Sequence, residues 1–126
     1  VPLKVRSGLP TSGVSLAELT FYGPAGEIDK RRGSATSDGM ELPADGPKMA
    51  IDGKAATTWT NPSLVPLEVA FDSPVGIVAF GFTTGGSSSL RDPVRWQLEA
   101  SDDGLNWTVA HDQTADYPTP AARASA

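Results

Sequence analysis

Few side chains of this 126-residue chain could carry out catalysis. His111 is the only histidine, and a Ser-His-Asp arrangement would need a carboxylate and an activated serine beside it. The sequence lacks the Gly-x-Ser-x-Gly motif that presents such a serine on a sharp turn. Asp102 and Asp103 are adjacent carboxylates, but neighbours on a turn usually point apart, so we interpret them as a hairpin tip and not as a glycosidase pair. We therefore predict a chain that is not an enzyme, in which His111 is a half-exposed structural residue.

A longer series of residues is typical of ligand binding. Residues 50–59 read Ala-x-Asp-Gly-x-x-x-Thr-x-Trp, and residues 96–108 read Trp-x-Leu-Glu-x-Ser-x-Asp-Gly-x-Asn-Trp-Thr. The order and spacing of these two motifs resemble the discoidin, or coagulation factor type C, family of galactose-binding-like domains. The resemblance extends over residues 14–120. It implies a β-sandwich that recognises a ligand, without catalysis, through loops at one end.

The resemblance places the ligand loops at residues 34–45, 61–65 and 83–92. Sugar sites combine an aromatic platform with polar donors, and the side chains of these types are Trp59, Asn61, Arg91 and Tyr117. A glycan is therefore the first partner that we expect. The scarcity of aromatic residues in the loops favours the alternative of a protein–protein docking module, or an accessory subunit of a larger assembly such as a ciliary or organelle-lumen complex. For Trp59, packing beneath its loop is the alternative to a ligand contact.

The resemblance also implies a metal. Carbohydrate-binding relatives hold a structural Ca²⁺ with the Asp of Asp-Gly and the Thr of Thr-x-Trp, which are Asp52 and Thr57 here. Calcium takes roughly six to eight oxygen ligands, so two side chains do not complete a site. The family draws a further carboxylate from near the C-terminus, where this sequence ends in Ala-Ala-Arg-Ala-Ser-Ala. The alternative is that Asp52 caps a turn at Gly53 while Thr57 bonds locally.

Composition narrows the classes of partner. The net charge of −5 argues against nucleic acid, which attracts clustered Lys and Arg. The only basic run, residues 30–32, is predicted to be a solvated turn. The absence of cysteine excludes disulfides and thiolate metal sites. Residues 85–89 carry no apolar cluster for insertion into lipid. The chain starts at Val1 without a Met, which indicates processing, and an extracellular or organelle-lumen location is favoured if a targeting segment was removed.

The elements that position these residues are predicted to be short strands. Alternating or continuous apolar residues predict strands at residues 14–22, 67–71, 75–82 and 94–101, with a return strand from Trp107. Residues 75–82 are apolar on both faces, which predicts a central strand covered on both sides. Residues 102–104 predict a tight turn. We expect Trp96 to pack in the core and Trp107 to plug one end of the sandwich.

The remaining segments are predicted to be irregular. Residues 27–48 form a long connection that is either functional or locally ordered. The tail after Thr114 is rich in Ala and Pro and is expected to lie on the surface or to fray. No helical periodicity appears. The sequence thus predicts one all-β domain over residues 1–126, an antiparallel sandwich with about eight strands and jelly-roll-like connections.

Overall fold

The computed structural model describes residues 1–9, 13–39, 44–86 and 88–124. Within these ranges the chain is all-β, as predicted, and the short helices are all of the 3₁₀ type. The strands are β1 (Pro2–Val5), β2 (Val14–Gly23), β3 (Gly26–Glu27), β4 (Gly33–Ser37), β5 (Trp59–Asn61), β6 (Leu67–Phe71), β7 (Ala79–Thr84), β8 (Pro93–Ala100) and β9 (Thr108–Gln113). The helices are η2 (Lys30–Arg32), η3 (Pro47–Ile51) and η4 (Ser89–Arg91), and no described helix is long and apolar enough to cross a membrane.

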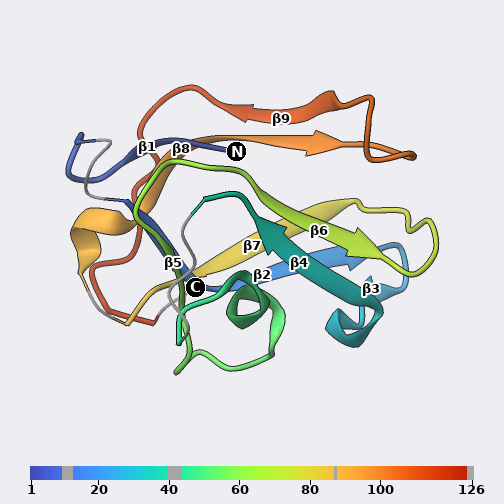
Figure 1. The fold of residues 1–126 in the computed structure, drawn as a ribbon, viewed down its shortest axis with the longest axis horizontal. Coiled ribbons are helices and arrows are strands. Elements are labelled where there is room, and N and C mark those ends of the chain that lie inside the picture. Colours follow the sequence, from blue (N-terminus) through green and yellow to red (C-terminus); the bar gives the residue numbers. More distant parts are fainter. Residues whose placement is uncertain (10–12, 40–43, 87, 125–126) are drawn as a thin grey trace.

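Among the described residues, all strand pairs are antiparallel and form three sheets. One sheet has the order β1-β8-β9, a second is built around β2 with β3, β5 and β7, and β4 pairs with β6. The β1-β8-β9 sheet forms one layer, and the strands around β2 together with β4 and β6 lie across from it (Figure 1). The predicted antiparallel sandwich is confirmed, with nine strands in the described residues against the eight expected. The jelly-roll order of its connections stays a prediction.

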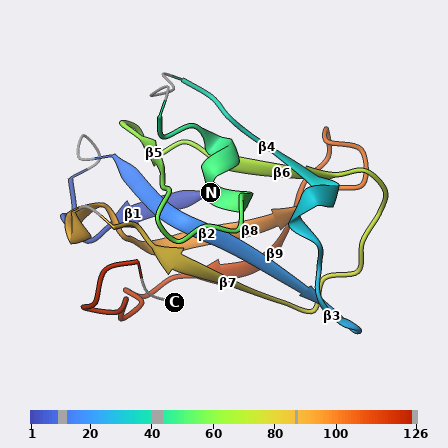
Figure 2. The ribbon, with the colours of Figure 1, turned by 90° about the horizontal axis from the view of Figure 1, so that it is seen from below.

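Strand β2 organises the second sheet. It pairs with β7 along one edge and with β5 along the other, and β2 and β7 run side by side along the molecule (Figure 2). Near its start, Val14 lies opposite Asn61 at the end of β5, and Leu16 lies opposite Thr84 at the end of β7. Since β5 and β7 both finish where β2 begins, the connections that follow them leave the sheet at the same end.

The core has an aliphatic and an aromatic part. The aliphatic part surrounds Trp59 and is made by Val5, Val14, Leu16 and Ala50, with Leu19, Leu64, Val65 and Leu67 packed against it. The aromatic part joins the two layers, because Phe80 and Phe82 of β7 meet Trp96 of β8 edge to face, with centroid distances of 6.4 and 5.3 Å. Such ring pairs stabilise a core beyond the area that they bury. Trp96, which was predicted to pack in the core, packs against these rings but is only partly buried.

The predicted central strand over residues 75–82 is wrong. Strand β7 starts only at Ala79 and continues to Thr84, and the side chains of Ile77 and Val78 are exposed. In the described part of the chain β7 pairs with β2 alone, so it is an edge strand. An apolar run therefore reaches solvent here, where the sequence suggested cover on both faces.

The β8–β9 hairpin keeps the predicted turn but not the predicted role of Trp107. Gly104 adopts a φ of +73°, which the turn requires. Leu98 pairs with His111 and Glu99 with Val109, so Ala110 is one extra residue, a β-bulge. Because successive residues face opposite sides of a strand, the bulge turns Val109 to the face of Glu99. Trp107, two residues earlier, is exposed on that face and does not plug the sandwich.

Both segments that were predicted to be irregular contain order. Residues 27–48 hold η2 and β4, and β4 pairs with β6 over its whole length. The tail lies largely on the surface, as one of the two predicted alternatives, and it is docked there. Thr119 is buried and Arg123 forms an ion pair with buried Asp92. The Ala- and Pro-rich composition gives no sign of this docking, because the side chains of Thr119 and Arg123 are enough to fix the segment.

Candidate functional site

The structure brings the predicted metal residues Asp52 and Thr57 together on one turn. Helix η3 ends at Asp52, and Gly53 follows with a φ of +78°. Asp52 Oδ1 accepts a hydrogen bond from the backbone N–H of Lys54 at 2.9 Å. Its Oδ2 accepts one from the Thr57 hydroxyl at 2.5 Å. This geometry matches the local alternative, in which Asp52 caps a turn and Thr57 bonds within it.

A third side chain, Glu18, reaches this turn from β2 and was not found by sequence reasoning. Its Oε1 accepts from the backbone N–H of Lys54 at 2.9 Å, and its Oε2 is paired with the ammonium of Lys30. Glu18 is buried and the Lys30 side chain is largely buried. The prediction of a solvated basic run is therefore wrong at Lys30. One signal was available, because Glu18, between Ala17 and Leu19, is the only charged residue of its strand.

Burial and neighbouring charges shift the two carboxyl groups in opposite directions. Burial raises the pKa of Glu18, against the lowering effect of Lys30, and the adjacent Asp52 carboxyl adds to the rise. For Asp52, burial also works to raise the pKa, but hydrogen bonds with Thr57 and Glu18 and the N–H of Lys54 outweigh it and hold the pKa below its usual value. The two carboxyl groups are thus close enough to titrate as an interacting pair.

These residues do not fit a calcium ion as they are arranged. Each of the four carboxylate oxygens of Glu18 and Asp52 already accepts from an N–H, a hydroxyl or an ammonium group. Calcium would need several of these oxygens facing it, with carbonyls or waters completing the shell. Among the described residues, no group of three or more His, Cys, Asp or Glu side chains could hold a metal. The chemistry of this turn is that of an internal ion pair.

A hollow of about 380 Å³ lies beside the turn. It is walled by two segments, residues 27–31 and residues 51–53, so that Lys30 and Asp52 both border it. Ile28 and Ile51 supply its apolar part, and Asp29 and Arg31 form an exposed ion pair at 2.9 Å on the first segment. The hollow gives solvent a route to the carboxylates of the turn.

Two of the predicted ligand residues, Trp59 and Asn61, lie inside the fold. Their exposed fractions are 2% and 1%. The Trp59 indole Nε1 lies 3.4 Å from Ser37 Oγ, and Asn61 Nδ2 donates to the backbone carbonyl of Asp38 at 3.1 Å. The two side chains therefore tie β5 to the last residue of β4 and to the residue that follows it. A side chain buried in this way offers no surface to a sugar, so the packing alternative for Trp59 agrees with the structure and Asn61 has a structural place.

The other two predicted ligand residues are accessible but lie on different elements. Arg91 is half-buried in η4. Tyr117 follows β9, is about half exposed, and packs its ring 5.5 Å from that of Trp96. The three predicted ligand loops are partly regular structure, since residues 34–37 belong to β4, Asn61 to β5, residues 83–84 to β7 and residues 89–91 to η4. Residues 40–43 and 87 lie outside the described residues.

His111, the one candidate for acid–base work, sits in an aromatic setting. It lies on β9 with its ring 5.7 Å from Phe80 and 6.4 Å from Trp96, and it is exposed. The contact with Phe80 is ring packing between the two layers, and the contact with Trp96 lies within the β1-β8-β9 sheet. They match the interpretation of His111 as a structural residue, although it is more exposed than expected.

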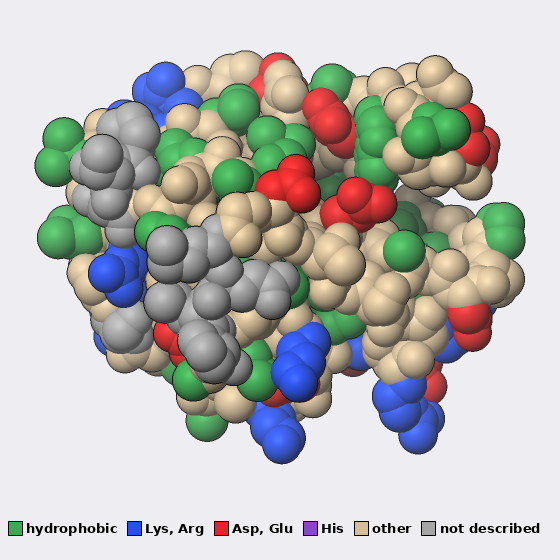
Figure 3. Space-filling view, in the orientation of Figure 1, with side chains coloured by type: hydrophobic (Ala, Val, Ile, Leu, Met, Phe, Trp, Pro, Cys, Tyr) green, Lys and Arg blue, Asp and Glu red, His purple; other side chains and the backbone are tan. Residues whose placement is uncertain are grey.

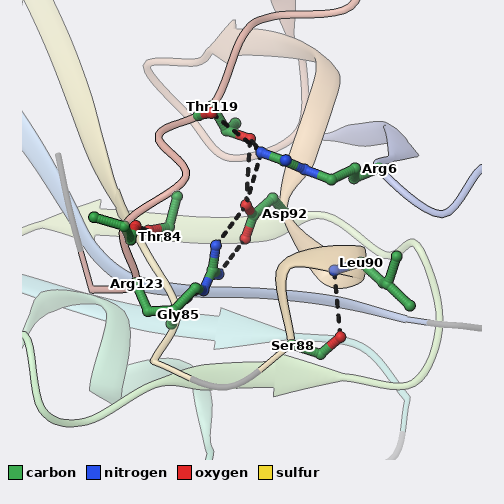
Figure 4. A network of polar contacts seen from close by, with 9 residues as sticks. Arg6, Thr84, Gly85, Ser88, Leu90, Asp92, Thr119 and Arg123 are labelled. Carbon is green, nitrogen blue, oxygen red and sulfur yellow. Dashed lines mark hydrogen bonds and ion pairs between the residues drawn. The ribbon is translucent and has the colours of Figure 1, made fainter.

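A second polar cluster surrounds Asp92, at the start of β8. The Asp92 side chain is fully buried and receives Arg123 through both of its oxygens, with Arg6 as a further partner (Figure 4). Thr119 donates to Asp92 Oδ2 at 3.2 Å, and Arg123 Nη2 also donates to the carbonyl of Gly85 at 2.8 Å. The cluster joins β1, the segment after β7 and the C-terminal tail. The Asp92 carboxylate is buried and fully hydrogen-bonded, although Arg123 Nε has no partner among the described residues, and this geometry is that of a structural clamp.

The most exposed apolar group lies on the β8–β9 hairpin. Leu105, Trp107 and Val109 have exposed fractions of 83%, 42% and 54%, and we call these three side chains the hairpin ridge. Figure 3 shows hydrophobic side chains gathered over this hairpin, with acidic side chains beside them. Asp102 and Asp103 lie at the tip of the same hairpin. Sequence reasoning missed the ridge because it placed Trp107 in the core.

Comparison of the chain with models of known protein families, with curated proteins and with solved structures finds no match.

Proposed function

We propose that this chain is a non-catalytic recognition module whose partner is another protein, contacted through the hairpin ridge. The observation that carries the proposal is the exposure of Leu105, Trp107 and Val109 on one hairpin. Exposed apolar side chains that are grouped and rimmed by polar residues are typical of interaction sites. Tryptophan is also among the residues that contribute most to binding energy when a partner covers them.

The geometry favours a protein over a glycan. Of the four residues considered for a sugar, Trp59 and Asn61 are buried, and Arg91 and Tyr117 belong to separate elements. A sugar site needs its aromatic platform and its polar donors on one surface. The acidic side chains at the hairpin tip and the overall charge of −5 complement a partner with an apolar groove and a basic rim. The resemblance to discoidin domains supports recognition in general and is compatible with either partner.

The test compares the wild-type chain with two variants of matched surface chemistry. Leu105→Ser/Trp107→Ser removes most of the ridge, and Ile77→Ser/Val78→Ser removes exposed apolar side chains elsewhere. Each immobilised protein is presented to an extract of the source organism and the retained proteins are identified. We expect a protein that binds the wild type and the Ile77→Ser/Val78→Ser control but not the ridge variant. Its Kd with each variant is then measured with purified components.

A glycan array on the wild type decides the alternative. Binding to one class of glycan that persists in the ridge variant and is lost in Tyr117→Ala or Arg91→Ala would overturn the proposal in favour of a lectin. Equal retention of the partner by the ridge variant would also contradict it. Because the ridge side chains are exposed, the ridge variant is expected to melt close to the wild type, which separates lost binding from lost folding.

A further inference from the structure

We infer that the ammonium group of Lys30 occupies the cation position of the Glu18–Asp52 turn, so that this chain dispenses with the calcium ion implied by its sequence motif. The inference starts from the misfit described above. Two carboxylates and a threonine hydroxyl converge, as they would around a cation, yet every carboxylate oxygen has a hydrogen-bond donor from the chain itself. Among these donors, Lys30 carries a full positive charge.

Charge balance supports this assignment. The turn places two carboxyl groups close together in a partly buried setting, where leaving them unpaired would be strongly unfavourable. Lys30 pairs with Glu18, and the positive charge of Lys54 acts on Asp52 from nearby. Two lysines therefore supply the two positive charges that a divalent ion would bring. The backbone N–H of Lys54 points at both carboxylates, and this also disfavours a metal ion between them.

The turn can be reached from solvent, so poor access is not the reason that a metal ion has no room there. Lys30 and Asp52 border the 380 Å³ hollow, so a hydrated ion has a route to the turn. What stands in its way is the lysine side chain itself. Removing that side chain should free Glu18 Oε2 and open a position near the Asp52 carboxylate and the carbonyl of Lys54, where a bound ion would have to displace the weaker, uncharged donors. Carboxylate and carbonyl oxygens are the hard ligands that Ca²⁺ prefers.

The experiment measures Tm with and without calcium. The wild type, Lys30→Ala, Lys30→Arg and the exposed-lysine control Lys48→Ala are each melted in EDTA and in about 5 mM CaCl₂, a concentration above the Kd of weak protein calcium sites. We expect the wild type, Lys30→Arg and Lys48→Ala to have the same Tm in both conditions. Lys30→Ala should melt about 10 °C lower in EDTA, because a buried carboxylate loses its partner. Calcium should raise the Tm of Lys30→Ala by about 5 °C, the shift for a site at about ten times its Kd.

Two further variants keep the test decisive. Lys30→Met retains the length of the side chain and replaces Lys30→Ala if the latter does not fold, and addition of Asp52→Asn should abolish its response to calcium. Magnesium, which demands a tighter octahedral shell, should raise the Tm less. A wild type that melts lower in EDTA than in calcium would overturn the inference. So would a calcium response of Lys30→Ala no larger than that of Lys48→Ala.

Discussion

Arg123 clamps Asp92 through both ends of its guanidinium group, with Nη1–Oδ2 at 2.9 Å and Nη2–Oδ1 at 2.6 Å. The carboxylate is fully buried, and the two residues are separated by 31 positions in the sequence. A bidentate pair of this kind fixes both distance and orientation. It therefore holds the C-terminal tail against the start of β8, at the end of the molecule where the connections after β5 and β7 emerge.

Replacement of Arg123 by methionine is expected to destabilise the fold by about 3 kcal/mol, the lower end of the range for breaking a buried ion pair, because the guanidinium keeps some contact with water. Urea unfolding measures this difference. Arg31→Met breaks an exposed pair with Asp29 and should leave the midpoint nearly unchanged. A loss in Arg123→Met no greater than that in Arg31→Met would mean that the clamp is not important for stability.

Two of the three tryptophans of the motifs, Trp59 and Trp107, should respond very differently to truncation. Trp59 is buried among Val5, Val14 and Leu16, so Trp59→Ala is expected to cost about 3–5 kcal/mol through the cavity that it leaves. Trp107 is exposed on the hairpin, and Trp107→Ala should cost less than about 1 kcal/mol. Chemical denaturation of both variants is the measurement. The reverse order would show that the indole of Trp107 is the buried one.

Two glycines allow the stability cost of a left-handed backbone to be measured separately from the cost of a steric clash. Gly8 and Gly13 have φ values of +73° and +75°, but a Cβ on Gly8 meets open space whereas one on Gly13 would lie 2.4 Å from the carbonyl oxygen of Asn61. Gly8→Ala should therefore cost about 1 kcal/mol, for the left-handed conformation alone. Gly13→Ala should cost about 3 kcal/mol, since the clash with β5 is added. Thermal melts that show equal losses would contradict the close approach of Gly13 to β5.

The hairpin tip should lose stability in acid. Asp103 accepts hydrogen bonds from the backbone N–H groups of Asn106 and Leu105, and these hold its pKa well below the usual value. A carboxyl group with a lowered folded pKa contributes stability above its unfolded pKa of about 4, and this contribution disappears as the pH falls towards the folded pKa. The difference in Tm between wild type and Asp103→Asn should thus shrink from pH 7 to pH 3.

The neighbouring Asp102 provides the control for this pH dependence. Asp102→Asn should follow the wild type at both pH values, because the hydrogen bonds of the turn go to Asp103. NMR titration should place the Asp103 carboxyl below the ordinary range of aspartate. A titration of Asp103 within that range would contradict the hydrogen-bonded turn.

The local sequence pattern predicted strands well where apolar and polar residues alternate and burial follows the same alternation. The strand over residues 67–71 has the expected boundaries, and its alternating burial reflects one face on the core. The prediction of a central strand over residues 75–82 was wrong, because apolar composition does not reveal whether a strand has neighbours on both sides. Strand β4 was missed for a related reason, since its Gly, Ser, Ala and Thr residues carry little apolar signal and its pairing with β6 decides its structure.

The site was less predictable than the fold, because its partners are far apart in the sequence. Asp52 and Thr57 are five residues apart and could be joined by motif alone. Glu18 and Lys30 reach them from β2 and η2, and only the tertiary structure shows this. The same holds for Asp92 and Arg123. Trp107 was misplaced because one extra residue in β9 reversed the direction of the side chains before it.

That extra residue, Ala110, determines which face of the hairpin the side chains before it occupy. With it, residues 107 and 109 share the face of Glu99, while His111 shares the face of Leu98. If Ala110 were instead paired with Glu99 in an unbroken ladder, Val109 would lie opposite Ala100 and would share the face of Leu98. The same six-residue strand can therefore display its apolar side chains or conceal them. A shift of one residue in the register between the first part of β9 and β8 would be enough to conceal this surface while leaving every other strand in place.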